Sequence, residues 1–142
     1  MIVVFDIGGT LSIVADRLKY LQLTPPDWDA FYNACGTDEC NEPIWSVWKA
    51  MREHHSIRFV TGRRESCRED TLKWMRDNLI TCPSEHLFMR TNGDLRHDTE
   101  IKPELIGDFK DDILVIFEDR NSMVKKWREL GYTCLQVADG DF

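Results

Sequence analysis

Apolar residues along the chain form short continuous runs, and between these runs apolar and polar positions alternate at helical spacing. Five runs have the length of strands buried on both faces, at residues 2–5, 57–60, 86–89, 113–117 and 133–137. The patterns between them predict helices that begin near Asp27, near Pro43 and near Lys102, and helices over residues 65–79 and 122–130. Strands that alternate with helices predict an α/β fold with a central parallel sheet covered on both faces.

The length of 142 residues predicts a single domain, residues 1–142. No apolar run approaches the roughly eighteen residues that a membrane span needs. The first residues also lack the basic start and long apolar stretch of a secretory signal. Five scattered cysteines are most simply free thiols of a reducing compartment. We therefore expect a cytoplasmic protein with no membrane association.

The charge balance limits which partners the protein is expected to bind. Acidic residues outnumber basic ones by 25 to 18, which gives a formal net charge of −7. Proteins that follow long stretches of nucleic acid by charge have the opposite balance. A nucleotide, or the end of a strand held in a locally basic pocket, remains compatible with this composition.

Candidate chemistry lies just beyond the expected strands, where open parallel sheets bind their ligands. Asp6 follows the first strand, Thr61 and Arg63 follow the second, and Glu118 with Asp119 follows the fourth. Carboxylates that converge there repel one another unless a cation joins them, and an all-oxygen ligand set suits Mg²⁺. A hydroxyl and a guanidinium suit a phosphate. Each acid alone is also explained as a helix cap, but the set together predicts phosphate chemistry.

Four segments at these positions carry a recognisable pattern. They are Phe5-Asp6-Ile7-Gly8-Gly9-Thr10-Leu11, Thr61-Gly62-Arg63-Arg64-Glu65-Ser66, Asp98 with Lys102, and Glu118-Asp119-Arg120. The pattern resembles the haloacid dehalogenase superfamily of phosphatases, and within it the 3′-phosphatase domains of phage polynucleotide kinases and their free-standing relatives. This resemblance covers nearly the whole chain and implies a three-layer, Rossmann-like domain in which residues 12–56 form at most a small helical cap. No Gly-rich loop ending in Gly-Lys-Ser/Thr is present, so we expect no kinase domain in this chain.

The resemblance implies a nucleophile and a metal site. Asp6 would attack phosphorus and form an aspartyl-phosphate. Mg²⁺ would be held by the Asp6 carboxylate, the backbone carbonyl of Gly8, and Glu118 and Asp119, directly or through water. The implied partner is a nucleotide or a nucleic-acid end that bears a terminal phosphate.

The resemblance also implies residues around the substrate phosphate. Thr61 would donate a hydrogen bond to the phosphoryl group, and Lys102 would neutralise that group and hold Asp6. Asp98, one helical turn before Lys102, would orient the lysine. Further substrate-binding positions would be Arg17, Gly62 and Arg63. The alternative for the two arginines is a solvated surface charge.

Gly8 departs from the family pattern, which has an aspartate two residues after the nucleophile. That aspartate protonates the leaving oxygen and then deprotonates the attacking water, a contribution typically worth about 10² to 10⁴ in rate. We therefore expect a Mg²⁺-dependent phosphomonoesterase acting on a nucleic-acid 3′-phosphate, with its activity reduced or abolished by Gly8. A mononucleotide 5′-phosphatase and a non-catalytic phosphate- or nucleotide-binding module remain the alternatives.

Trp28 is the strongest candidate for stacking on a nucleobase. It shares one face of the first expected helix with Phe31 and Tyr32. The same helical spacing is typical of core packing, which is the alternative for these aromatic residues.

Overall fold

A five-stranded parallel sheet forms the centre of the structure, a computed structural model that describes residues 1–142. Its strand order is β5-β4-β1-β6-β7. The strands are β1 (Ile2–Phe5), β4 (Ser56–Arg64), β5 (Leu87–Arg90), β6 (Ile113–Arg120) and β7 (Cys134–Gly140). All four neighbouring pairs are parallel, which confirms the predicted α/β class with a central parallel sheet.

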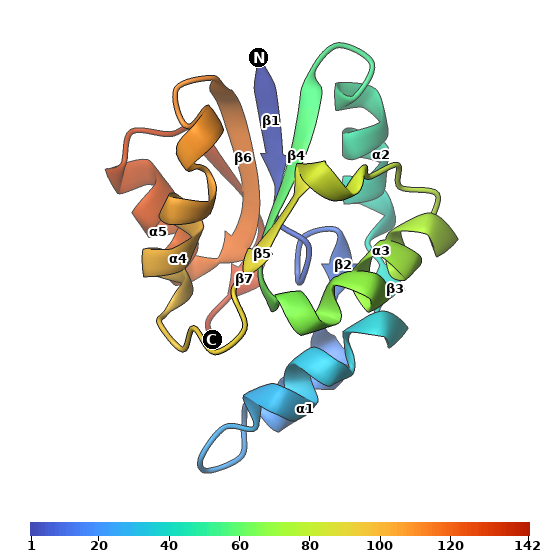
Figure 1. Cartoon of the computed structure of the whole chain (residues 1–142), viewed down its shortest axis with the longest axis vertical. Coiled ribbons are helices and arrows are strands. Elements are labelled where there is room, and N and C mark those ends of the chain that lie inside the picture. Colours follow the sequence, from blue (N-terminus) through green and yellow to red (C-terminus); the bar gives the residue numbers. More distant parts are fainter.

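Helices cover both faces of this sheet and give three layers (Figure 1). One face carries α2 (Glu42–Met51) and α3 (Arg68–Asp77), and the other carries α4 (Asp98–Leu105) and α5 (Asn121–Glu129). A short helix, α1 (Trp28–Asn33), projects beyond the sheet, and β2 (Ser12–Ile13) pairs with β3 (Glu39–Cys40) in a separate antiparallel pair. The 3₁₀ helices span Ala15–Tyr20, Cys35–Thr37, Glu65–Cys67, Ser84–His86 and Gly107–Phe109.

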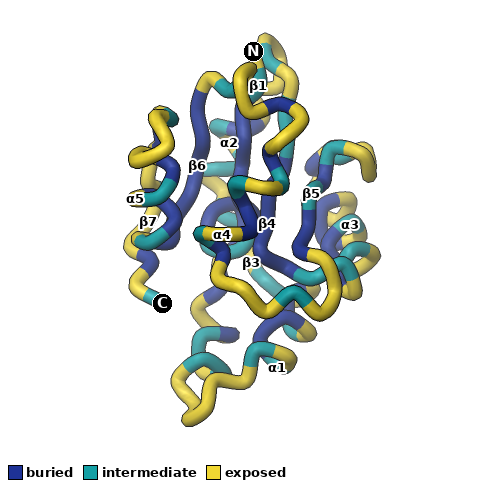
Figure 2. The backbone as a smooth tube through the Cα atoms, turned by 60° about the vertical axis from the view of Figure 1, so that its left-hand side comes forward, coloured by how far each residue is buried: buried dark blue, intermediate teal, exposed yellow.

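Alternation along β1 divides the apolar core into two clusters. Val3 and Phe5 face the cluster under α2 and α3, while Val4 faces the cluster under α4 and α5. Figure 2 shows the central strands as the most buried part of the chain. Burial of each such side chain stabilises the fold by about 1.5–3 kcal/mol. The continuous apolar run therefore marks a strand with no solvent-facing side.

The motif residues of β4 and β6 lie within the last residues of these strands. β4 continues to Arg64 and β6 to Arg120, several residues beyond the apolar runs that predicted them. The pairing becomes irregular there, with register shifts between Thr61 and Arg64 and between Glu118 and Arg120. Since the chain passes from β1 to β4 on one side and β6 adjoins β1 on the other, this edge is a topological switch point of the sheet.

The start of α4 corrects the sequence prediction. The helix begins at Asp98, where the His97 side chain accepts a hydrogen bond from the backbone N–H of Thr99. Pro103 lies inside the helix, not in its first turn as predicted. The prediction failed because proline favours a first turn, whereas here the cap at His97, six residues before Pro103, had already begun the helix. Asp98 and Lys102 consequently share this helix and are one turn apart.

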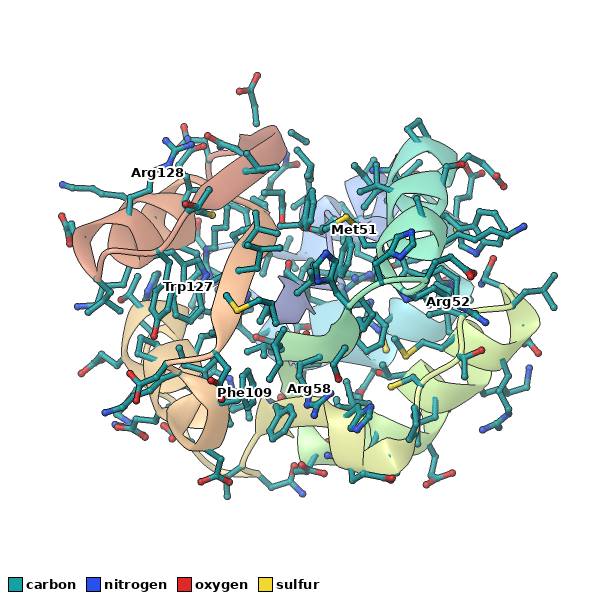
Figure 3. The ribbon with its side chains drawn as sticks, turned by 90° about the horizontal axis from the view of Figure 1, so that it is seen from above. Met51, Arg52, Arg58, Phe109, Trp127 and Arg128 are labelled. Carbon is teal, nitrogen blue, oxygen red and sulfur yellow. The ribbon has the colours of Figure 1, made fainter.

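The segment between the first two motifs is divided between two places in the fold. Residues of β2 and α1 lie at the carboxyl edge of the sheet, whereas α2 covers the sheet face and ends at the opposite edge (Figure 1). Figure 3, viewed from that opposite edge, shows Arg58 near Phe109, with 6.0 Å between the guanidinium carbon and the ring centre. None of the helices has the length and apolar character required to cross a bilayer.

Candidate active site

Three carboxylates meet at the carboxyl edge of β1 and β6. Asp6, Glu118 and Asp119 are all buried, and each offers an oxygen within 4.8 Å of the others' oxygens. Asp6 directly follows β1, and Glu118 and Asp119 are among the last three residues of β6. The sequence prediction that these acids converge is borne out by the geometry.

Lys102 lies between two of these carboxylates. Its ammonium Nζ is 2.9 Å from Asp6 Oδ1 and 2.8 Å from Glu118 Oε2. Burial disfavours the charged form of the lysine, but the two carboxylates outweigh burial and hold the pKa of Lys102 above its ordinary value. The lysine is therefore a fixed positive charge beside Asp6.

One ammonium does not neutralise three carboxylates. Burial and the charge of Asp6 raise the pKa of Glu118 well above its ordinary value and raise the pKa of Asp119 to about 7. A second cation, bound among these oxygens, would relieve the repulsion, and hard oxygen ligands suit a divalent ion such as Mg²⁺. The donor set thus fits the predicted metal site, and Gly8 lines the same cavity.

Gly9 is required by the close approach of Asp119. Its φ angle is +86°, and a Cβ atom built on it would lie 2.1 Å from Asp119 Oδ2. Both the backbone conformation and the space exclude a side chain at this position.

Thr61 and Gly62 bring β4 to the cavity. The Thr61 hydroxyl accepts a hydrogen bond from the backbone N–H of Arg63 at 3.2 Å, so its own proton remains available to an anion. A Cβ on Gly62 would lie 2.4 Å from Asp98 Oδ1, which makes glycine necessary there as well. The motif Thr61-Gly62-Arg63 therefore combines a hydroxyl donor with a close packing position.

Asp98 is held by two arginines that the sequence interpretation did not connect with it. Its carboxylate accepts from Arg90 and from Arg120, the latter at 2.9 Å. Burial alone would raise the pKa of Asp98, but the neighbouring cations, Lys102 foremost, lower it. The hydrogen bonds of Lys102 itself go to Asp6 and Glu118, so Asp98 acts on the lysine through charge and not through a direct bond.

Arg17 and Arg63 are buried, each with about 3% of its surface exposed, so the alternative of solvated surface charges is wrong. Asp38 joins them. Its carboxylate accepts hydrogen bonds from Arg17 Nε and Nη2, both at 2.7 Å, and from Arg63 Nη2 at 3.3 Å. Sequence reasoning missed Asp38, which lies between a 3₁₀ helix and a two-residue strand and belongs to no periodic pattern.

Arg63, which lines this cavity, has a buried donor without a partner. Arg63 Nε is buried and has no hydrogen-bond partner, although buried donors are nearly always paired. Arg63 lines the same cavity of about 40 Å³ as Asp6, Arg17, Thr61 and Lys102. The cavity therefore presents one candidate nucleophile to several cationic and hydroxyl donors, which is an arrangement suited to a phosphoryl group.

We expect Asp38→Asn to destabilise the protein by about 3 kcal/mol, because removal of one partner leaves two guanidinium groups buried without a countercharge. Urea unfolding measures this change. Asp77→Asn is the control, because the ion pair of Asp77 with Lys73 is exposed and such pairs contribute less than about 1 kcal/mol to stability. Equal stabilities of the two variants would contradict a structural role for the Asp38 ion pairs.

Comparisons with known proteins place this geometry in context. The family model described as the polynucleotide kinase PNKP phosphatase domain matches residues 1–142. Two solved chains from Pnkp1/Rnl/Hen1 complexes, one described as an RNA repair complex, are each 30% identical to this chain over 99% of its length, with TM-scores of 0.83 and 0.80. This chain spans only 43% and 46% of those two chains.

A more distant similarity concerns the fold alone. The class C acid phosphatase from Bacillus anthracis, solved with tungstate bound, is 18% identical over 82% of this chain and 51% of its own, with a TM-score of 0.58. The central sheet and its covering helices are thus shared beyond the range of clear sequence similarity.

Proposed function

The chain belongs to the family of polynucleotide kinase phosphatase domains, of haloacid dehalogenase type, and from this premise we propose that it removes the 3′-phosphate from a nucleic-acid end with the help of Mg²⁺. The observation that carries the proposal is the placement of the Asp6 carboxylate. It lies in one small cavity with Lys102, Thr61 and Arg63, and the buried Nε of Arg63 has no hydrogen-bond partner. The ammonium, guanidinium and hydroxyl groups of this cavity favour a phosphate over an uncharged substrate.

In the first step, an oxygen of Asp6 attacks phosphorus while the bond from phosphorus to the sugar oxygen breaks. Lys102 holds Asp6 in position and offsets its negative charge against that of the incoming phosphate. Thr61 and Arg63 donate to the phosphoryl oxygens, where charge is concentrated in the transition state. The product is an aspartyl-phosphate on Asp6 and a free 3′-hydroxyl once the leaving oxygen takes up a proton.

The metal would be held by Asp6, Glu118 and Asp119, with the backbone carbonyl of Gly8 as a further oxygen. When bound, Mg²⁺ supplies positive charge that reduces the repulsion between the carboxylate and the phosphate. The raised pKa values of Glu118 and Asp119 support this assignment, because both result from burial and from the repulsion that a cation would remove.

Gly8 sets the expected rate. The leaving oxygen needs a proton, and the water that later hydrolyses the aspartyl-phosphate must lose one, but Gly8 has no side chain to serve either step. Solvent must then act in its place. We therefore propose slow turnover for the chain as it stands.

The substrate class is proposed from the relatives and from the charge. Two relatives with 30% identity are chains of Pnkp1/Rnl/Hen1 complexes, which favours a nucleic-acid end. The net charge of −7 favours a small substrate and keeps a mononucleotide 5′-phosphatase as the second candidate.

The test is phosphate release, with Mg²⁺ and with EDTA, from 3′-phosphorylated oligonucleotides, nucleoside 3′-monophosphates and nucleoside 5′-monophosphates. We expect release from the 3′-phosphates, a preference for the oligonucleotide, and loss of release in EDTA. Faster release from 5′-monophosphates would support the second candidate instead. Binding of all three without any release, even after the substitution of Gly8 described below, would indicate a non-catalytic phosphate-binding module.

A further inference from the structure

The catalytic cavity is too small for more than the phosphate, so the rest of the substrate must lie outside it. Its volume is about 40 Å³, whereas pockets that receive whole small molecules measure about 300–1,000 Å³. Two larger recesses adjoin its mouth. One has about 350 Å³ and shares Trp28, Tyr32, Asp98 and Arg120 with the cavity, and the other has about 570 Å³ and shares Asp119 and Phe142.

The two recesses differ in charge. The smaller one, here called the arginine recess, is lined by two aspartates, Asp94 and Asp98, and by four arginines, so its lining has an excess of positive charge; the arginines are Arg64, Arg90, Arg96 and Arg120. The larger one, here called the acidic recess, is lined by Asp119, Asp139 and Asp141 and contains no lysine or arginine. A substrate with further phosphates is repelled by the acidic recess and attracted by the arginine recess, so the larger volume is not the better site for it.

Within the arginine recess, the four guanidinium groups are not equivalent. Arg90 and Arg120 are buried and bonded to Asp98. Arg64 and Arg96 are more exposed, with 23% and 44% of their side-chain surfaces accessible, and they pair with acids at the surface. The exposed pair of Arg64 with Asp29 is weak, so Arg64 can exchange its partner for a phosphate. Arg96 is held more firmly, because it contacts both oxygens of Asp94 and both oxygens of Glu104, and a phosphate there must compete with these two acids.

The same recess offers an apolar surface for a base. Trp28 is fixed by its neighbours, stacked on Tyr32 with 5.8 Å between ring centres and edge-on to Phe31 at 5.6 Å. Arg64 lies over the Tyr32 ring, with its guanidinium carbon 5.1 Å from the ring centre. Leu95, which is 83% exposed, lines the recess as well. An indole held in place and an exposed leucine form a surface suited to a planar base.

We infer that the arginine recess binds the terminal nucleotide of a phosphate-ended strand, with its base against Trp28 and the preceding phosphodiester at Arg64 and Arg96. The inference rests on the proposed function, because the catalytic cavity must hold the terminal phosphate. It adds a site that selects a strand end over a mononucleotide. A mononucleotide 3′-phosphate has the base but lacks the phosphodiester, so it engages Trp28 and leaves the two arginines unused.

The test measures binding, so that slow turnover does not obscure it. Fluorescence anisotropy, in Mg²⁺ and in the Asp6→Asn background to prevent phosphate transfer, follows a labelled single-stranded hexanucleotide with a 3′-phosphate, with an unlabelled nucleoside 3′-monophosphate as competitor. We expect the hexanucleotide to bind at least about tenfold more tightly. We also expect its affinity to fall with salt, as for a contact to a phosphate.

Three variants separate the parts of the site. Arg64→Gln with Arg96→Gln should weaken hexanucleotide binding about tenfold, reduce the salt slope by about 0.7 and leave mononucleotide binding unchanged. Trp28→Ala should weaken both ligands about tenfold, whereas Trp28→Phe, which keeps an aromatic face, should retain most of the affinity and also controls for the folding of α1.

Two control variants are expected to bind like the parent. Leu21→Ala alters the acidic recess, and Arg52→Gln removes an exposed guanidinium at the opposite edge of the sheet, where Figure 3 labels it. Equal affinity for hexanucleotide and mononucleotide would overturn the inference, as would a loss of affinity in Leu21→Ala but not in the arginine variant. Phosphate release without this selectivity would support the proposed function and contradict the role of the arginine recess. Selective binding without release would support the role of the recess and contradict the proposed function.

Discussion

Asp6→Asn is expected to lower phosphate release by about 10⁴-fold or more, because an amide oxygen is a poor nucleophile and the proposed reaction passes through this carboxylate. The amide has nearly the same shape as the carboxylate, so Lys102 keeps its contact with Glu118 at 2.8 Å. Initial rates of phosphate release from a 3′-phosphorylated oligonucleotide measure the loss. They are compared in the parent chain and after Gly8→Asp, where the starting rate is expected to be higher.

The fold of Asp6→Asn provides the control for this result. One of three crowded carboxylates is removed, and the charge of Asp6 is among the causes that raise the pKa of both Glu118 and Asp119. We therefore expect the urea midpoint to stay unchanged or to rise, even though Lys102 loses a partner. Retention of more than about a hundredth of the activity would show that phosphate transfer does not use Asp6.

The parts of the site that the sequence predicted are those carried by the strands. Since parallel strands end at one edge, the order of elements alone was sufficient to place Asp6, Thr61 and Asp119 together. The apolar run of β1 was unambiguous because its residues face two apolar clusters, one on each side of the sheet.

The parts that could not be predicted depend on pairing between distant charges. Asp38 lies 21 residues from Arg17 and 25 from Arg63, and no local periodicity connects an acid in an irregular segment with either arginine. For the same reason the sequence left open that Arg17 and Arg63 are solvated surface charges, and only their burial in the structure excludes this. Arg90, which fixes Asp98, carried no signal either, because an arginine that ends a short strand is usually solvated.

The structure can be asked directly whether position 8 requires a glycine. The family pattern implies an acid at this position, and the structure leaves room for a Cβ atom there. A Cβ on Gly8 would meet Val14 Cγ1 at 3.5 Å, Arg17 Nη2 at 3.6 Å and Arg63 Nη2 at 4.0 Å, all ordinary contacts. Unlike Gly9, this glycine has no positive φ angle that would strain a side chain. Neither steric crowding nor backbone conformation therefore accounts for glycine at this position.

Gly8→Asp is expected to raise kcat for phosphate release by about 10² or more, since general acid–base catalysis typically contributes about 10² to 10⁴. The new carboxyl group would lie beside Arg17, which is already held by Asp38 and can orient the added side chain. Steady-state rates on the 3′-phosphorylated oligonucleotide measure the gain in kcat.

Gly8→Asn is the matched control, because it fills the same space without a titratable proton. If Asn and Asp raise the rate equally, the gain comes from packing and the acid–base argument is contradicted. If the chain with Gly8 is already fast and Asp adds nothing, another group must supply the proton, and Gly8 does not impair the reaction. A gain confined to Asp, lost again when Asp6→Asn is added, would connect the nucleophile and the restored acid in one reaction.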